Sequence, residues 1–222
     1  MVNQDRNVFA ACMVAAGDVD AMVTGLTRNY HVALDEITRV LDPEPDSRVF
    51  GLSLVLGQDK TLFVSDTAVT ELPNSEQLAD IAQQTAAVAR QMGHEPRVAL
   101  ISFSNFGNPA LPRSELVSNA VKILGQRQAD FEYDGEMTVD VALNAEVMKN
   151  YPFCRLSEPA NILVVPARHS ASISVKLMQE MGGATVIGPI LTGIDKQVKI
   201  CSTTSTVNDI LNMAIMAACK VG

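Results

Sequence analysis

The feature that most constrains the fold is an alternation of short apolar runs, polar loops and helical patterns along the chain. Residues 21–23 form the first apolar run, residues 24–30 a glycine-containing loop, and residues 32–41 a helical pattern. Such crossovers join parallel strands, because a helix carries the chain back to the start of the next strand. We therefore expect an α/β protein with a mainly parallel sheet and helices on both faces.

Composition and charge limit the class of partner. The 222 residues are 47% hydrophobic and 19% charged, which suits a globular chain with a sizeable core. The net charge is -8 and the pI is near 4.8, so the overall field repels nucleic acid and anionic membrane surfaces. No apolar run has the length of a membrane span and no secretion signal is present, so we expect a cytoplasmic protein without nucleic-acid or membrane partners.

Cysteine and histidine spacing argues against a metal site. The three histidines form no metal-binding pattern and the cysteines form no C-x-x-C pair, so no metal is expected. Reduced, buried thiols are predicted for all four cysteines: Cys12, Cys154, Cys201 and Cys219.

Prolines and glycines indicate two lobes. Residues 42–46 (DPEPD) forbid continuous helix and are typical of a linker, and Gly188-Pro189 marks a second crossing. We predict an incomplete first lobe made of residues 1–42 and 188–222, and a second lobe of residues 43–187. The last helical pattern, residues 207–218, should return to pack on the first lobe.

Small polar residues follow the predicted strands. Hydroxyls and backbone N–H groups at the start of a helix suit phosphate or carboxylate oxygens, although simple helix capping also explains each loop. The strand ends in question are Thr24-Gly25, Ser65-Asp66, residues 102–105, residues 134–136 and residues 202–204. Together they favour a shared cleft for an anionic ligand, because parallel strands end at one edge.

Charged residues near these loops are candidates for the same site. Asp134 and Glu136 suit a general acid–base pair, or alternatively an ordinary solvated turn. Arg28, Arg168 and Lys199 can contact an anion, or can be surface charges. Neither a P-loop nor a G-x-G-x-x-G sequence is present, so a nicotinamide site would lie outside this chain.

Several segments resemble a known family over nearly the whole chain. Residues 134–136 (DGE) with Asp140, residues 159–164 (PANILV) and residues 184–193 (ATVIGPILTG) are similar to segments of the phosphate acetyl/butyryl transferases. Residues 17–30 (GDVDAMVTGLTRNY) resemble the version fused behind the catalytic domains of large bacterial malic enzymes. So do residues 3–9, 102–109 and 151–157 (NQDRNVF, SFSNFGNP and YPFCRLS).

The resemblance implies a two-lobed domain with an isocitrate/isopropylmalate dehydrogenase-like fold that forms homodimers, and a larger homo-oligomer in the full-length enzyme. It also implies acetyl-CoA as an effector of malate oxidation to pyruvate, with NADP and a divalent metal bound only by the catalytic part outside this chain. The family's domain has further strands before the point where this sequence starts, so we expect Met1 to be a designed or internal start.

One departure from the family affects chemistry. True phosphotransacetylases carry Ser-Arg-Gly where this chain has Ser202-Thr203-Thr204, while Asp209 matches the family's catalytic aspartate. Without the guanidinium, Ser202 and Asp209 should be vestigial catalytic residues. The predicted function is thus a regulatory domain, with an active phosphate acyltransferase and a purely structural oligomerisation domain as alternatives. The expected ligand-binding residues are Thr24, Gly25, Arg28, Ser102, Ser104, Asp134, Glu136, Lys199, Ser202 and Thr203.

Overall fold

The chain divides into two compact units in a computed structural model that describes residues 5–219. Unit 1 comprises Met1–Leu52 and Ile187–Gly222, and unit 2 comprises Ser53–Val186. Unit 1 is made of two separate stretches of the chain, like the predicted first lobe. The first boundary between the units falls within strand β2 (Phe50–Leu56) instead of at the proline-rich segment.

A six-stranded sheet carries the strand order β5-β4-β6-β3-β2-β7. The pairs β3–β6, β4–β6 and β4–β5 are parallel, which confirms the predicted mainly parallel arrangement. The strands other than β2 are β3 (Thr61–Ser65), β4 (Arg97–Ile101), β5 (Glu132–Met137), β6 (Ile162–Val164) and β7 (Thr185–Thr192).

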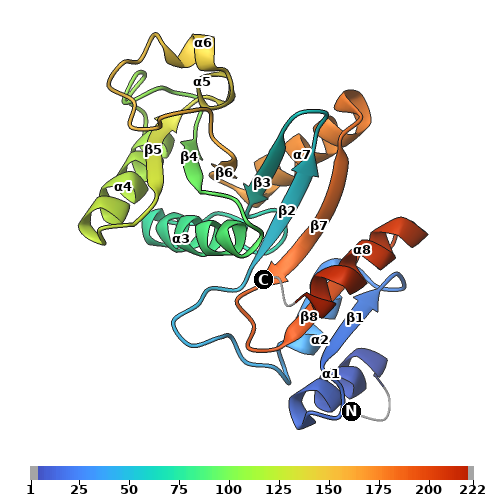
Figure 1. Ribbon diagram of the computed structural model, residues 1–222. Helices are drawn as coiled ribbons and strands as arrows, with labels where there is room; N and C mark the ends of the chain where they lie inside the picture. The colour runs from blue at the N-terminus through green and yellow to red at the C-terminus, as the bar shows by residue number, and fades with distance from the viewer. Residues whose placement is uncertain (1–4, 220–222) are drawn as a thin grey trace. The chain divides into compact units, whose positions relative to one another are not determined.

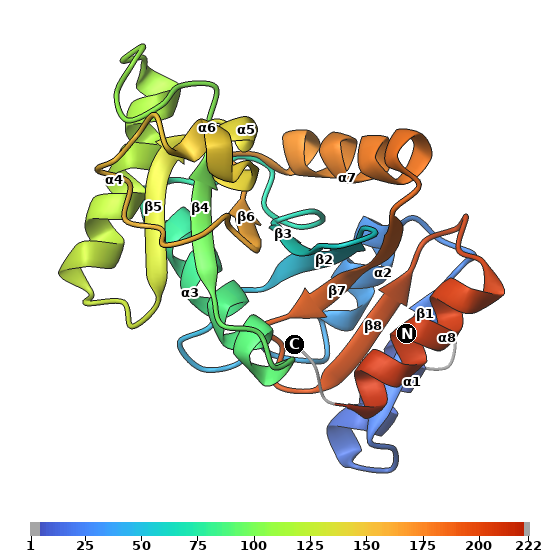
Figure 2. The ribbon, with the colours of Figure 1, turned by 45° about the horizontal axis from the view of Figure 1, so that its top comes forward.

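Helices cover both faces of the sheet in unit 2 (Figures 1 and 2). The helices α3 and α4 pack on one another and on β4, while α5 and α7 pack on β4 and β3, respectively. The helices of this unit are α3 (Ser75–Gln91), α4 (Pro112–Gln126), α5 (Val139–Leu143), α6 (Ala145–Met148) and α7 (Arg168–Gly182).

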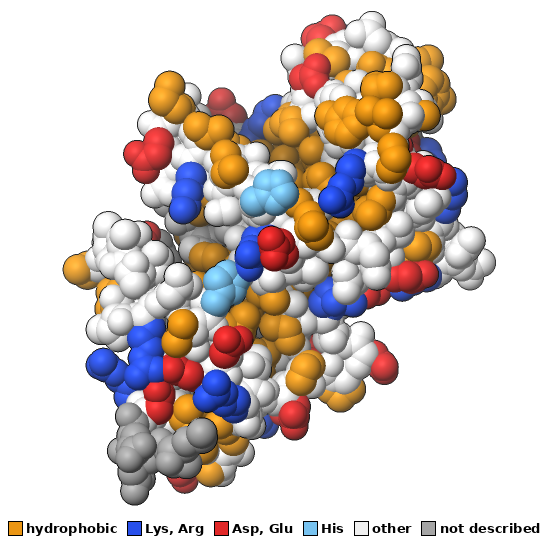
Figure 3. Space-filling model, turned by 180° about the vertical axis from the view of Figure 1, so that it is seen from behind, with side chains coloured by type: hydrophobic (Ala, Val, Ile, Leu, Met, Phe, Trp, Pro, Cys, Tyr) orange, Lys and Arg blue, Asp and Glu red, His pale blue; other side chains and the backbone are white. Residues whose placement is uncertain are grey.

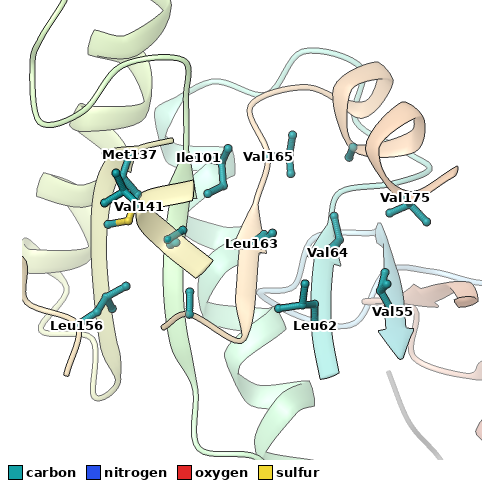
Figure 4. Packing of buried hydrophobic residues seen from close by; sticks show 14 of the residues in the cluster. Val55, Leu62, Val64, Ile101, Met137, Val141, Leu156, Leu163, Val165 and Val175 are labelled. Carbon is teal, nitrogen blue, oxygen red and sulfur yellow. The ribbon is translucent and has the colours of Figure 1, made fainter. Parts of the chain in front are cut away.

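Alternating side chains of the central strands fill two cores. Ala99, Ile101 and Leu163 join a cluster with Val141 of α5 and Val175 of α7 (Figure 4). The residues between them along β4 and β6, which are also fully buried, point to the opposite face, because successive side chains of a strand alternate. Each buried aliphatic side chain contributes roughly 1.5–3 kcal/mol, so the sheet is held from both sides.

Unit 1 contains a two-stranded parallel sheet of β1 (Ala21–Gly25) and β8 (Gln197–Cys201). The last helix, α8 (Val207–Ala218), lies against both strands (Figure 1), which confirms its predicted return to the first lobe. The helix α2 (Tyr30–Ile37) also packs on both strands, and α1 (Arg6–Ala16) packs on β1 and α2.

Capping residues and prolines explain several ends of helices and strands. Asp5 caps α1, whereas Gly188-Pro189, expected to mark a crossing between the lobes, lies inside β7. The sheet order places β7 at the edge, where a missing N–H is tolerated. The helices α5 and α6 are separated at Asn144, whose side chain caps α6.

The cysteines are all free thiols. Cys201 is buried, as expected, but Cys219 is exposed and Cys12 and Cys154 are half-buried, so the prediction of burial was wrong for these three. Their apolar neighbours in sequence belong to helices and loops that face solvent on one side.

Candidate functional site

The parallel pairing of β1 and β8 brings two predicted loops together in unit 1. Thr24 lies beside Ile200 and Gly25 beside Cys201, so the loops that begin at Thr24 and Ser202 leave the same edge. Gly25 has φ +116°, and a Cβ atom there would lie 2.0 Å from the carbonyl oxygen of Cys201. Only glycine permits this close approach of the two strand ends.

Arg28 belongs to a network of ion pairs instead of standing alone. Its Nη1 donates to Asp5 Oδ2 at 2.5 Å and to the carboxylate of Glu36. Asn7 donates to Glu36 at 2.6 Å and accepts from Thr24 Oγ1 at 2.5 Å. Two of the predicted ligand-binding residues, Thr24 and Arg28, are therefore connected through α1 and α2.

The carboxylate of Asp5 serves both the helix cap and Arg28. Burial acts to raise the pKa of Asp5, but the backbone N–H groups of Val8 and Asn7, with Arg28, outweigh burial and lower it. The network thus places two carboxylates, Asp5 and Glu36, against one guanidinium.

Lys199 is not the surface cation that the sequence suggested. Its side chain is 1% exposed, and Nζ donates to the carbonyl oxygen of Leu191 at 3.1 Å. Burial lowers the pKa of Lys199 to about 8. Its neighbours along the strand, Val198 and Ile200, are buried as well, so β8 is covered on both sides at Lys199.

The loop after β8 exposes hydroxyl groups. Ser202 and Thr203 face solvent, and Ser202 Oγ lies 3.1 Å from the hydroxyl of Thr204. Asp209 forms a capping box with Thr206, accepting from its N–H at 2.7 Å and its hydroxyl at 2.9 Å. The structure therefore uses the Asp209 carboxylate to begin α8.

In unit 2, Glu136 fills the loop that follows β4. This glutamate is 1% exposed and accepts from the hydroxyl of Ser104 at 3.1 Å and from the N–H of Gly107 at 2.6 Å. Ser102 lies beside this cluster, 3.5 Å from Ser104 Oγ. The loop that was predicted to bind an anion thus holds the protein's own carboxylate, and a ligand role for Ser102, Ser104 and Glu136 stays a prediction.

Asp134 is paired with Arg155, a residue that the sequence did not single out. The carboxylate accepts from the Arg155 backbone N–H at 2.8 Å and from its guanidinium at 2.9 Å. The guanidinium also lies over the ring of Tyr133, 4.8 Å from its centre. Burial acts to lower the pKa of Arg155, and Asp134 overrides this effect and raises it. Asp134 therefore secures Arg155 beside β5, and Glu132 of the same strand secures Ser157.

Asp66 shows the same behaviour at the end of β3. It is 2% exposed and accepts from the N–H groups of Ala68, Val69 and Thr70 at 2.9, 3.0 and 2.6 Å. Arg168, expected to contact an anion, begins α7, and its N–H donates to Glu71. The protein's own carboxylates, Asp66, Asp134 and Glu136, thus accept from the groups of three predicted loops.

Sequence reasoning missed Asn7, Glu36 and Arg155, which hold candidate site residues. Asn7 and Glu36 lie 29 positions apart in the chain, and no local pattern joins them. The signal that could have found Glu36 is its place in the apolar stripe of α2, where a carboxylate needs a partner.

A metal site and a membrane span each place requirements on the described residues. Within residues 5–219, no group of three or more histidine, cysteine, aspartate or glutamate side chains can hold a metal ion. No helix in the same range is long and apolar enough to cross a membrane.

The fold and the arrangement of strand-end loops define an α/β protein of the phosphotransacetylase type. A phosphotransacetylase from Streptococcus pyogenes superposes with a TM-score of 0.89 at 29% identity, over 97% of this chain and 67% of that one. A phosphotransacetylase from Staphylococcus aureus gives 0.86 at 27% identity, with coverage of 97% and 67%. The phosphate acetyl/butaryl transferase family matches residues 1–218. The chain belongs to that family.

Curated relatives include longer proteins. An NADP-dependent malic enzyme from Rhizobium meliloti is 57% identical over 100% of this chain and 29% of its own length. A probable NADP-dependent malic enzyme from Rickettsia prowazekii is 45% identical over 98% of this chain and 30% of its own length. The chain spans under a third of these relatives, so it is similar to a minor part of them.

Proposed function

We propose that this chain is the regulatory domain of an NADP-dependent malic enzyme and that it binds acetyl-CoA without transferring the acetyl group. The observation that carries the proposal is Thr203 beside Ser202, where the resemblance implies an arginine. The 57% identity to a malic enzyme supports the context. Losing a guanidinium aimed at a developing charge costs several kcal/mol of transition-state stabilisation, while binding can persist.

The proposed acetyl-CoA site uses the loops after β1 and β8. The net charge of -8 repels a polyanion, so the site needs a local cation. Arg28 is that cation, because the other candidate in unit 1, Lys199, is buried. On the face shown in Figure 3, Lys and Arg side chains lie scattered among acidic and apolar ones, without a broad basic area. Ser202 and Thr203 add exposed hydroxyls as hydrogen-bond donors.

Malate kinetics with the full-length enzyme test this function. Acetyl-CoA should change malate turnover in the intact protein, and Arg28→Ala should reduce that change while effector-free turnover stays nearly intact, because coupling is lost and chemistry is not. Full-length enzyme that neither binds acetyl-CoA nor responds to it would leave only the structural-domain alternative.

An active phosphate acyltransferase is the second candidate, favoured by the likeness to solved phosphotransacetylases. Exchange between acetyl phosphate and CoA decides between the two. Thr203→Arg should raise that exchange if the rest of the site is retained.

A homodimer is also proposed, with the outer side of α7 as its contact. Ile173, Leu177 and Met181 form a stripe at intervals of one helical turn and are 57%, 57% and 85% exposed. A stripe of this kind is self-complementary across a two-fold axis, so one copy can cover another. Light scattering of Leu177→Lys against the unaltered chain tests the contact.

The wider setting is part of the same proposal. The domain acts in the cytoplasm within a larger homo-oligomer, and NADP and a divalent metal bind the remainder of the enzyme. An isocitrate/isopropylmalate dehydrogenase-like fold is supported by a superposition on 4-hydroxythreonine-4-phosphate dehydrogenase from Klebsiella pneumoniae, with a TM-score of 0.57 at 13% identity, a likeness of fold alone.

A further inference from the structure

Glu36 is a buried carboxylate on the core-facing side of α2. It shares that side with Ala33, Leu34 and Ile37 and is 7% exposed. Replacing a buried ion pair by apolar residues of similar volume is often neutral or stabilising. Stability alone therefore does not account for a glutamate at this position, and its partners suggest a role.

Both oxygens of the Glu36 carboxylate are engaged. Oε2 accepts from Asn7 Nδ2 at 2.6 Å, and Oε1 accepts from Arg28 Nη1. An ionised carboxylate has no hydrogen to donate. The Asn7 amide must therefore turn its NH2 group toward Glu36 and its oxygen toward Thr24.

The orientation of the Asn7 amide also fixes the hydrogen bond of Thr24. The Thr24 hydroxyl oxygen lies 2.5 Å from Asn7 Oδ1, and only the hydroxyl can supply the proton between them. Thr24 therefore donates to Asn7, and only its lone pairs are left for a ligand. A hydroxyl fixed in this way accepts from an N–H or O–H group and cannot donate to a phosphate oxygen.

The guanidinium of Arg28 is bonded through one of its three nitrogens, Nη1. Nη1 is engaged by Glu36 and by Asp5, whereas Nη2 and Nε make no hydrogen bond to the residues that the structure describes. The side chain is 33% exposed. The two remaining nitrogens can therefore meet an anion in a fixed orientation.

We propose that Glu36 is a positioning residue that makes Thr24 an acceptor for an amide N–H or hydroxyl of the ligand and orients Arg28 toward a phosphate. The inference rests on the proposed binding of acyl-CoA. An acyl-CoA carries both kinds of group, because its pantetheine arm holds amide N–H groups and its nucleotide end holds phosphates.

Glu36→Gln gives a sharp test, because the side-chain volume is unchanged. The introduced glutamine can offer its oxygen to Arg28 only by presenting its NH2 group to Asn7. The Asn7 amide must then reverse and donate to Thr24, which leaves the Thr24 hydroxyl hydrogen, instead of its lone pairs alone, facing the ligand. Calorimetry with acetyl-CoA should show about tenfold weaker binding for Glu36→Gln and for Thr24→Val. Thr24→Ser and the matched charge control Asp35→Asn, an exposed neighbour on α2, should stay within about twofold.

A double-mutant cycle separates positioning from a general effect on folding. If Glu36 acts through Thr24, adding Thr24→Val to Glu36→Gln should weaken binding by less than about twofold more, since the contact is already lost. Thermal unfolding checks that each variant is folded, and Glu36→Met serves in place of Glu36→Gln if the latter does not fold.

The outcomes distinguish the inference from the proposed function. Unchanged affinity in a folded Glu36 variant, or fully additive losses in the cycle, overturns the positioning role while acyl-CoA binding stands. Absence of acetyl-CoA binding by the unaltered protein overturns both.

Discussion

The two units use the same strand, loop and helix order but treat their polar loops differently. In unit 2, Asp66, Asp134 and Glu136 are buried and accept from the N–H or hydroxyl groups of the loops around them. In unit 1, Ser202 and Thr203 are exposed, and Arg28 keeps two nitrogens without a bond to the described residues. The loops of unit 2 are thus filled by the protein's own carboxylates, whereas the proposed ligand site in unit 1 keeps exposed hydroxyls and part of a guanidinium.

The carboxylates explain this contrast. A side-chain carboxylate within reach of several N–H groups forms charge-assisted bonds with no loss of translational freedom, so it competes well with a free ligand. Unit 1 places its buried carboxylate, Glu36, against Arg28 and Asn7 instead. The comparison predicts different responses of the two units to substitution.

The largest effect is expected at the strand ends of unit 1. Gly25→Ala would put a Cβ atom 2.0 Å from the Cys201 carbonyl oxygen, so β1 and β8 must separate. We expect a loss of about 4 kcal/mol or more in the free energy of unfolding. Gly17→Ala, which has a positive φ but meets no atom within 4 Å, should cost only about 1 kcal/mol. Denaturant unfolding that gives equal losses would refute the close approach.

Lys199→Met should stabilise the protein. The lowered pKa means that the charged lysine is penalised in the folded state, by about 3 kcal/mol below pH 8. This penalty fades as the pH rises from about 8 to the unfolded value of 10.5, so stability of the unaltered protein should rise over that window. The variant, which lacks the buried charge, should be more stable than the unaltered protein at pH 7 and should lack the rise. A lower stability of the variant at pH 7 would contradict the assignment.

Glu136→Ala probes the filled loop of unit 2. It leaves the Ser104 hydroxyl and the Gly107 N–H without their acceptor, which should cost about 2 kcal/mol of stability. Acetyl-CoA affinity should not change if this loop is structural. Glu146→Ala, which removes an exposed carboxylate paired with Lys149, is the matched control and should cost under about 1 kcal/mol. If Glu136→Ala loses acetyl-CoA affinity and Glu146→Ala does not, the loop that holds Glu136 is part of the ligand site.

Much of the architecture was predictable because it depends on local patterns. The alternation of strands and helices and the return of α8 follow from periodicity and from apolar faces. The strand β7 was missed, since Gly188-Pro189 indicates a break and only an edge position tolerates it.

The candidate site was less predictable, because its partners are distant in sequence. Asp134 looks like an acid or base until Arg155 is placed beside it, and Lys199 looks exposed until its strand is covered. The only sequence feature that points to Glu36 is its position, as an acidic residue, in the apolar stripe of α2. Hydrogen-bond satisfaction is a property of the folded chain, and composition does not reveal it.

Arg28→Ala is expected to act on stability to a moderate degree and on binding specifically. The Arg28 side chain is one-third exposed, so its ion pair with Asp5 contributes about 1 kcal/mol or less. Loss of the cation beside the buried Glu36 should cost about 2 kcal/mol. Acetyl-CoA affinity should fall about tenfold. Arg39→Ala, an exposed arginine just after α2, removes the same charge and should leave affinity within about twofold. Equal losses in both variants would point to the overall field instead of a contact.

The central claim, binding without acyl transfer, is tested most directly by two readings on one preparation of the protein. Calorimetry with acetyl-CoA should give saturable binding, and an assay of acetyl phosphate with CoA on the same sample should give no appreciable exchange, because Thr203 cannot stabilise the developing charge. Exchange at ordinary enzyme rates, roughly 1 to 1,000 per second, would contradict the account.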